Sequence, residues 1–258
     1  MKKLNTFKYY LQLLEVFTIR EIKSRYRASL LGFLWIVLYP LILAFILNFV
    51  FGRFVKINTH GIPYFLFVLS GILFWNIFQQ SVSLAKESLV WNRDLVTKTS
   101  FPKNTLPLSY VFSKIPDFFV NCAILLFFYF LSGYEPHTSS FFIFLLIIPL
   151  FLFSAGISLA VSLANAVFRD FGRITELFLL LLFYATPIVY PDFLVPGNYK
   201  FFLLINPLSS MILFTRELLF RNNFRVDLFS LSLILSLFIF GLGFLLFRKF
   251  EKKMADLI

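Results

Sequence analysis

Long uncharged stretches separated by short basic segments dominate the pattern of apolar and polar positions. The first stretch covers residues 28–52, which are 25 residues without Asp, Glu, Lys or Arg. At about 1.5 Å of helical rise per residue, it exceeds the roughly 30 Å hydrocarbon core of a bilayer. The basic sequence IKSRYR, with Lys23, Arg25 and Arg27, comes directly before it. Because basic flanks stay in the cytoplasm, we expect a first membrane span that begins on the cytoplasmic side.

Four further uncharged windows predict spans of adequate length. They are 57–85, 118–134, 136–168 and 228–247. The 118–134 window is at the short end of spanning length, so Lys114 is expected to snorkel to the interface and Asp117 to lie at the boundary. The spans are then expected to carry no ionisable residue near mid-depth. That expectation disfavours transport coupled to protons or sodium, which needs such groups or broken helices.

Two shorter windows, 177–191 and 201–215, have 15 residues each, which as helices reach only roughly 22 Å. The basic tail at residues 248–253 predicts a cytoplasmic C-terminus. With both termini on one side, the number of spans must be even. We therefore expect 177–191, extended by Ile174 and Thr175, to cross, and 201–215 to be an external or re-entrant helix. The predicted fold is an all-α integral membrane protein with six transmembrane helices.

The distribution of charge supports this orientation. Of the 24 Lys and Arg residues, 18 fall in segments expected on the cytoplasmic side and 6 in segments expected outside. This is a strong positive-inside bias. The net charge of +11 does not indicate nucleic-acid binding, because the basic residues alternate with apolar spans. Anionic membrane lipid is the expected partner of these flanks.

Three segments are expected outside the bilayer core, all within one membrane domain, residues 1–258. Residues 1–28 are predicted to form an amphipathic helix in the cytoplasmic interface, because apolar side chains recur at helical spacing. Residues 86–103 are predicted to be a polar cytoplasmic loop, which Pro102 ends. Residues 191–225 are an external segment broken by prolines. The apolar face of the first segment consists of Phe7, Tyr10, Leu11, Leu14 and Phe17.

The chain lacks the motifs of several enzyme classes. No GxxxxGK[ST] phosphate loop occurs, so an ATPase would have to be a separate chain. Cys122 is the single cysteine, and His60 and His137 are far apart, so no cluster has metal-ligand spacing. We expect no catalytic, cofactor-binding or metal-binding residue in this chain. A membrane-embedded enzyme without such motifs, or a scaffold, remains the alternative of a different class.

Three segments resemble the permease subunits of ATP-binding-cassette polysaccharide exporters, which export O-antigen, capsule and teichoic-acid chains. They are IKSRYRASLLGFLWIVLYPL, NAVFRDFGRITELFLLLLFYATPIVYP and INPLSSMILFTRELLF. The resemblance covers nearly the whole chain. It implies a homodimeric channel in a bacterial cytoplasmic membrane, with both termini cytoplasmic and two copies of a partner ATPase that binds ATP and Mg. The implied substrate is a lipid-linked polysaccharide; export of a small lipid or drug is the alternative.

The resemblance also assigns candidate sites at the cytoplasmic side. Residues 86–100 correspond by position to the helix that couples the permease to its ATPase, and an aromatic anchor among alternating charges suits such a contact. The coupling candidates are Lys86, Glu87, Trp91, Arg93 and Asp94. The candidates for the cytoplasmic entrance of the channel are Arg25, Arg27, Arg169 and Asp170.

Aromatic side chains are candidates for the channel lining, because sugar rings pack their C–H faces on aromatic faces. The conduit candidates are Trp35, Tyr39, Phe45, Phe49, Tyr184 and Tyr190. Contact with lipid is the alternative for each ring. The external gate is expected to involve Pro191, Asn206, Pro207 and Arg216. In the fourth span, small residues at i, i+4 spacing, including Gly156, predict close packing between spans.

Overall fold

The computed structural model describes residues 2–27, 34–135 and 137–257, and the regular structure of this part is entirely helical. Five helical segments are long and apolar enough to cross a membrane: Leu34–Phe54, Tyr64–Ala85, Thr105–Leu131, Thr138–Val167 and Val226–Glu251. The first consists of α2 (Leu34–Leu47) and the π-helix η1 (Asn48–Phe54), and the second is α3 (Tyr64–Ala85). The all-helical membrane fold predicted from the sequence is confirmed. Residues 28–33 of the first predicted span lie outside the described residues.

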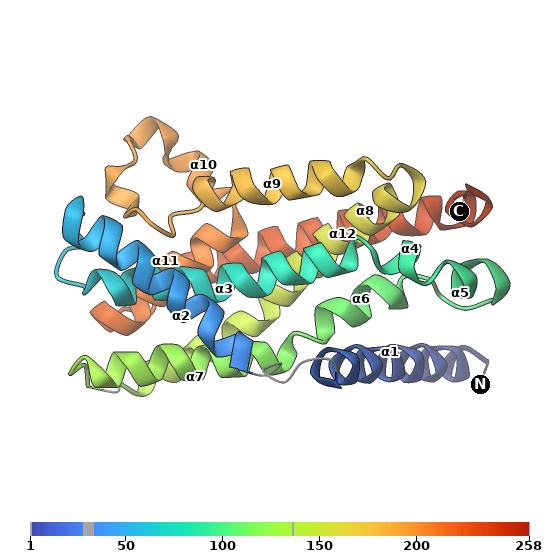
Figure 1. The fold of residues 1–258 in the computed structure, drawn as a ribbon, viewed down its shortest axis with the longest axis horizontal. Coiled ribbons are helices and arrows are strands. Elements are labelled where there is room, and N and C mark those ends of the chain that lie inside the picture. Colours follow the sequence, from blue (N-terminus) through green and yellow to red (C-terminus); the bar gives the residue numbers. More distant parts are fainter. Residues whose placement is uncertain (1, 28–33, 136, 258) are drawn as a thin grey trace.

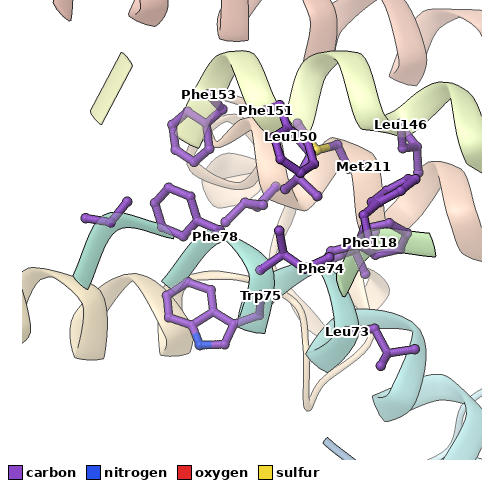
Figure 2. Close-up of a cluster of buried hydrophobic side chains, with 14 of the residues drawn as sticks. Leu73, Phe74, Trp75, Phe78, Phe118, Leu146, Leu150, Phe151, Phe153 and Met211 are labelled. Atoms are coloured by element: carbon purple, nitrogen blue, oxygen red, sulfur yellow. The ribbon is translucent and has the colours of Figure 1, made fainter. Parts of the chain in front are cut away.

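The spans run side by side along the long axis of the molecule, and α3 lies in the middle of them (Figure 1). Most of α3 is buried, whereas α2 and η1 are partly buried on one side and exposed on the other. Interlocking aromatic rings fill the space between α3 and its neighbours, as Figure 2 shows for Phe74, Phe78 and Phe153. The rings of Phe78 and Phe153 stack with centroids 4.7 Å apart, a favourable arrangement for an aromatic pair.

Helices α8 (Ile147–Val167) and α12 (Val226–Leu257) approach each other through glycine. A Cβ at Gly156 would lie 2.7 Å from the backbone of Ile239, and one at Gly243 would lie 2.2 Å from the carbonyl oxygen of Gly156. The backbones therefore touch where neither residue has a side chain. The predicted packing role of Gly156 is confirmed. Residues Thr138–Leu146, which precede α8, form the 3₁₀ helix η2.

The third span differs from its prediction. It comprises α6 (Thr105–Phe112) and α7 (Ile115–Leu131), so it begins 13 residues before the expected position 118. Lys114 and Asp117 consequently lie inside the span, only 2% and 4% exposed. The expectation that Lys114 snorkels to the interface is wrong, because its side chain is buried within the protein. The physical reason is that it pairs with Asp117 at 3.1 Å, so it does not have to reach the aqueous interface. The expectations of Asp117 at the boundary and of spans without charge near mid-depth stay predictions.

Short elements gather at the two ends of the bundle. One end, here called the basic end, carries α1 (Lys2–Arg27), α4 (Ser88–Trp91), α5 (Arg93–Lys98) and the C-terminal part of α12. Figure 1 places both termini there. The opposite, distal end carries residues 55–63 and the short helices η3 (Asp192–Leu194), η4 (Gly197–Tyr199) and α10 (Lys200–Leu204). Termini at one end agree with an even number of crossings.

The predicted N-terminal helix is present as α1, and it packs on α6. Leu14 and Phe17 contact the core, and the Phe17 ring meets that of Phe101 edge-on at 5.8 Å. Phe7 and Leu11 are 63% and 46% exposed. The expected apolar face is thus divided, with one part buried on the protein and another free to contact lipid.

Two elements are candidates for the sixth membrane crossing. Helix α9 (Phe171–Ala185) has only 15 residues and runs beside the bundle from the basic end (Figure 1). The stretch Gly197–Leu204 and α11 (Pro207–Arg221) reach spanning length only when taken together, and they are bent by 102° at the break. The choice of 177–191 as the crossing segment stays a prediction.

Candidate functional sites at the two ends of the bundle

The segment formed by α4 and α5 projects from the basic end (Figure 1). Its underside is anchored by Leu89 and Val96, which are 0% and 2% exposed. Trp91 on the outside is 60% exposed, and Arg93 and Asp94 are exposed beside it. This fixed backbone with an exposed indole and charges is suited to binding another protein.

Electrostatics keep the outer face of this segment charged. The ammonium of Lys98 lies 2.8 Å from the carboxylate of Asp94. Its hydrogen bond and charge hold the pKa of Asp94 below the ordinary value. Asp94 is therefore ionised at neutral pH and offers a fixed negative charge next to Arg93.

Of the other two coupling candidates, Lys86 is buried and Glu87 is partly buried, with 28% of its side chain exposed. Lys86 is 6% exposed, and its Nζ lies 2.6 Å from Oε1 of Glu176. Asn165 donates hydrogen bonds to the Lys86 carbonyl at 3.0 Å and to the Glu87 carboxylate at 3.3 Å. These contacts join the end of α3 to α8 and α9. Lys86 is thus positioned to fix the base of the segment, and its ammonium offers little surface to a partner.

The four entrance candidates are not brought together by contacts among the described residues. Arg169 and Asp170 are exposed in the turn between α8 and α9. Arg27 ends α1, and its side chain lies outside the described residues. Arg25 instead reaches Asp117 on α7. The entrance assignment of these residues stays a prediction.

Arg25 belongs to a cluster of charges that the sequence did not single out as a site. Its Nη1 lies 3.1 and 3.0 Å from the two oxygens of Asp117, and Nη2 donates to Ser113 at 2.7 Å. Lys114 shares the same carboxylate at 3.1 Å and also bonds Oε1 of Gln80. The i, i+3 spacing of Lys114 and Asp117 within apolar sequence was an available signal, because such pairs neutralise each other on one helix face.

The conduit candidates are mostly exposed on the single chain. Trp35, Tyr39, Phe45, Phe49 and Tyr184 are 48–63% exposed. Tyr190 is half-buried and donates its hydroxyl to the carbonyl of Tyr184 at 3.1 Å. Exposed rings on α2 and α9 suit both a lipid-facing position and a channel wall completed by a second copy. Both alternatives therefore remain open, and the conduit assignment stays a prediction.

The gate candidates surround the start of α11. Asn206 caps this helix by accepting from the Leu208 N–H at 3.1 Å, and its side-chain amide donates to Thr186 at 2.8 Å. Pro191 and Pro207 are buried on either side of this link. This hydrogen bond links the residue that follows α9 to the start of α11.

Arg216 lies deeper than an external charge was expected to lie. It is 5% exposed, and its guanidinium bonds Phe67, Ser70, Pro187 and Ile188. It also lines a cavity of about 380 Å³ at the distal end, together with Arg221, Arg225 and Asp192. Arg216 therefore bonds buried groups of the bundle and also borders the cavity at the distal end.

Comparison with known proteins places this architecture in a family. Residues 12–220 match the family described as ABC-2 type transporter. The chain belongs to the ABC-2 type transporter family. It is similar to two proteins of Klebsiella pneumoniae named O-antigen export system permease protein RfbA, at 31% and 32% identity over 97% of this chain and 96% of each relative.

More distant relatives carry related names. A Myxococcus xanthus protein with the O-antigen permease name is 30% identical over 75% of this chain and 74% of its own length. A polysialic acid transport protein KpsM of Escherichia coli is 23% identical over 93% of this chain and 94% of its own length. The chain is thus a multi-pass membrane protein of a permease family, and the resemblance read from its motifs is confirmed.

Proposed function

We propose that this chain is the transmembrane subunit of an ATP-driven exporter that moves a lipid-linked polysaccharide outward across a bacterial cytoplasmic membrane. The observation that carries this proposal is the end-to-end similarity to O-antigen export permeases at 31–32% identity. The similarity covers both the spans and the segments at the two ends. The basic end is cytoplasmic in this proposal, since most Lys and Arg lie in the segments assigned to it.

The energy source is a separate ATPase, present in two copies, which binds ATP and Mg. Trp91, Arg93 and Asp94 form the surface that docks on this ATPase, because they are exposed on a firmly anchored segment. The ion pair between the buried Lys86 and the exposed Glu176, at 2.6 Å, connects that segment to α9. Movement of the docked ATPase is relayed through this connection to the spans. The purified chain alone is expected to hydrolyse no ATP.

Two copies of the chain form the conduit. The exposed aromatic rings of α2 and α9 line or border this conduit. There they pack on sugar rings and require no particular order of sugars in the polysaccharide. Asn206 and Arg216 hold the distal segment that closes the opening. The polysaccharide enters at the basic end and leaves at the distal end.

Deletion of the gene in its source bacterium, followed by complementation, tests the function. Loss of surface polysaccharide, with lipid-linked polymer retained inside, is the expected result, and the wild-type chain should restore export. Unchanged surface polysaccharide together with lost efflux of a small lipid or drug would replace the proposal with its alternative. If the deletion causes neither defect, a scaffold without a transport role would be favoured.

A further inference from the structure

A cavity of about 530 Å³ opens at the basic end between α1, α3, α4 and α6. Its wall includes the cations Arg25 and Lys114, the polar side chains of Gln80 and Tyr110, and the indole of Trp91. Cations and hydrogen-bonding groups thus line part of a largely apolar space that is large enough for a headgroup. Of the channel and gate candidates named above, only the entrance candidate Arg25 lines this cavity.

The cations on the wall are only half neutralised. Arg25 and Lys114 share the single carboxylate of Asp117, at 3.0 and 3.1 Å. Glu21 also borders the cavity, but its carboxylate is bound to Arg20 at 2.7 Å. Among the described residues of this cluster, one positive charge is left over. A buried excess charge is costly in low-dielectric surroundings, so an anion in the cavity would stabilise the cluster.

The donors suit phosphate oxygens in particular. An arginine fork and a lysine ammonium are the side chains that bind phosphate by charge-assisted hydrogen bonds. Lys114 is 2% exposed and held by Gln80 and Asp117, so it is pre-positioned. We propose that this cavity binds the phosphate group of a lipid headgroup. The group comes either from a phospholipid of the surrounding leaflet or from the diphosphate of a lipid-linked substrate.

The cavity is also joined to the segment proposed to dock on the ATPase. Trp91 forms one wall, and Arg20 of α1 donates to the side chain of the adjacent Asn92 at 3.1 Å. A headgroup between α1 and α4 therefore contacts the same indole that faces the partner. This link rests on the proposed function: it makes occupancy of the cavity a signal that the ATPase can sense.

Binding is tested with the purified full chain in dodecyl maltoside, a detergent without phosphate, and without any ATPase. Calorimetric titration uses three probes: inorganic pyrophosphate, geranyl diphosphate and short-chain phosphatidylglycerol, with geraniol as the uncharged reference. Saturable binding of the phosphate probes but not of geraniol is expected. Binding of the diphosphates alone identifies the substrate carrier as the source, and binding of phosphatidylglycerol identifies membrane phospholipid.

Charge variants decide whether the cavity is the site. Lys114→Gln removes the excess charge and should weaken binding by about tenfold or more, as expected for a lost charge-assisted bond. Asp117→Asn increases the excess positive charge, so this variant should bind the phosphate probes more tightly than the wild type does. Lys8→Gln is the matched control, because Lys8 is an exposed cation of α1, and its affinity should stay within about twofold, as for most surface substitutions.

Gel filtration and thermal unfolding check that each variant is folded, and Arg25→Gln replaces Lys114→Gln if the latter does not fold. The wild type without saturable binding overturns the proposal. So does an Asp117→Asn variant that loses affinity as Lys114→Gln does, because the ion pair would then be purely structural. Since no export is measured, this outcome would leave the proposed polysaccharide function standing.

Discussion

The guanidinium carbon of Arg216 lies 3.4 Å from the centroid of the Phe67 ring. The same group donates to the Phe67 carbonyl at 3.0 Å and to the Pro187 carbonyl at 2.7 Å. One side chain of α11 thus holds α3 and the segment after α9 together. A buried cation is tolerated here because carbonyl and hydroxyl oxygens and a ring face replace its hydration.

We expect Arg216→Ala to lower the free energy of unfolding by roughly 3 kcal/mol or more, because the change leaves several buried carbonyls without a donor. Thermal unfolding of the purified protein in detergent measures this loss. Arg221→Ala is the control: Arg221 pairs with Glu217 but is 53% exposed, so its removal should cost at most about 1 kcal/mol. Equal losses in the two variants would mean that the Arg216 network adds nothing beyond a surface pair.

A second prediction concerns the contact between α8 and α12. Gly243→Ala places a Cβ 2.2 Å from the Gly156 carbonyl oxygen, whereas a Cβ at Gly241 meets no atom within 4 Å. Both substitutions gain the same helix propensity of about 1 kcal/mol, so their difference reports packing. We expect Gly243→Ala to be less stable than Gly241→Ala by about 1–3 kcal/mol, the usual cost of overpacking. Similar thermal midpoints of the two purified variants would contradict backbone-to-backbone packing.

The orientation of the chain is tested by reporter fusions. Alkaline phosphatase is active only outside the cytoplasm and green fluorescent protein is fluorescent mainly inside it. Fusions after Ile258 should report a cytoplasmic position and fusions within residues 135–139 an external one, because basic segments stay inside. The same signal from both sites would contradict an odd number of crossings between them.

The fold followed from the uncharged windows, because length and apolar composition suffice to place a helix in lipid. The same method misplaced the start of the third span, since it treats every charge as a boundary. Lys114 and Asp117 are compatible with the interior only because Arg25 and Gln80 lie beside them. Those partners are 34 or more positions away in sequence, so no local pattern could reveal them.

At the candidate sites too, contacts between residues far apart in sequence could not be predicted. The sequence predicted a coupling segment at residues 86–100, but it could not separate the buried Lys86 from the exposed Trp91, because burial depends on contacts with Glu176 and Asn165 of other helices. The burial of Arg216 was missed for the same reason, since its partners Phe67, Ser70 and Pro187 lie on other segments. Conversely, the capping role of Asn206 before Pro207 is local, and this kind of contact is what a sequence pattern predicts well.

The last prediction concerns docking of the proposed ATPase on α4 and α5. Trp91→Ala removes an indole that is 60% exposed on the single chain. If the partner buries this indole, its loss should weaken association by about 2 kcal/mol, as expected of an aromatic anchor at an interface. Exchanging the charges, with Arg93→Asp and Asp94→Arg, should weaken it further by placing like charges together at a desolvated contact. Pull-down of the ATPase by the purified permease measures both effects.

Two matched variants separate docking from folding. Phe7→Ala truncates an aromatic side chain of α1 that is 63% exposed, and it should change association by no more than about 0.5 kcal/mol. Lys86→Ala removes a buried side chain that bonds Glu176 and the Gly172 carbonyl, so it should lower the thermal midpoint of the permease, whereas Trp91→Ala should leave that midpoint unchanged. Wild-type association and wild-type export by folded Trp91→Ala protein would show that this segment is an ordinary solvated loop. The signal from the ATPase would then have to pass through another part of the basic end.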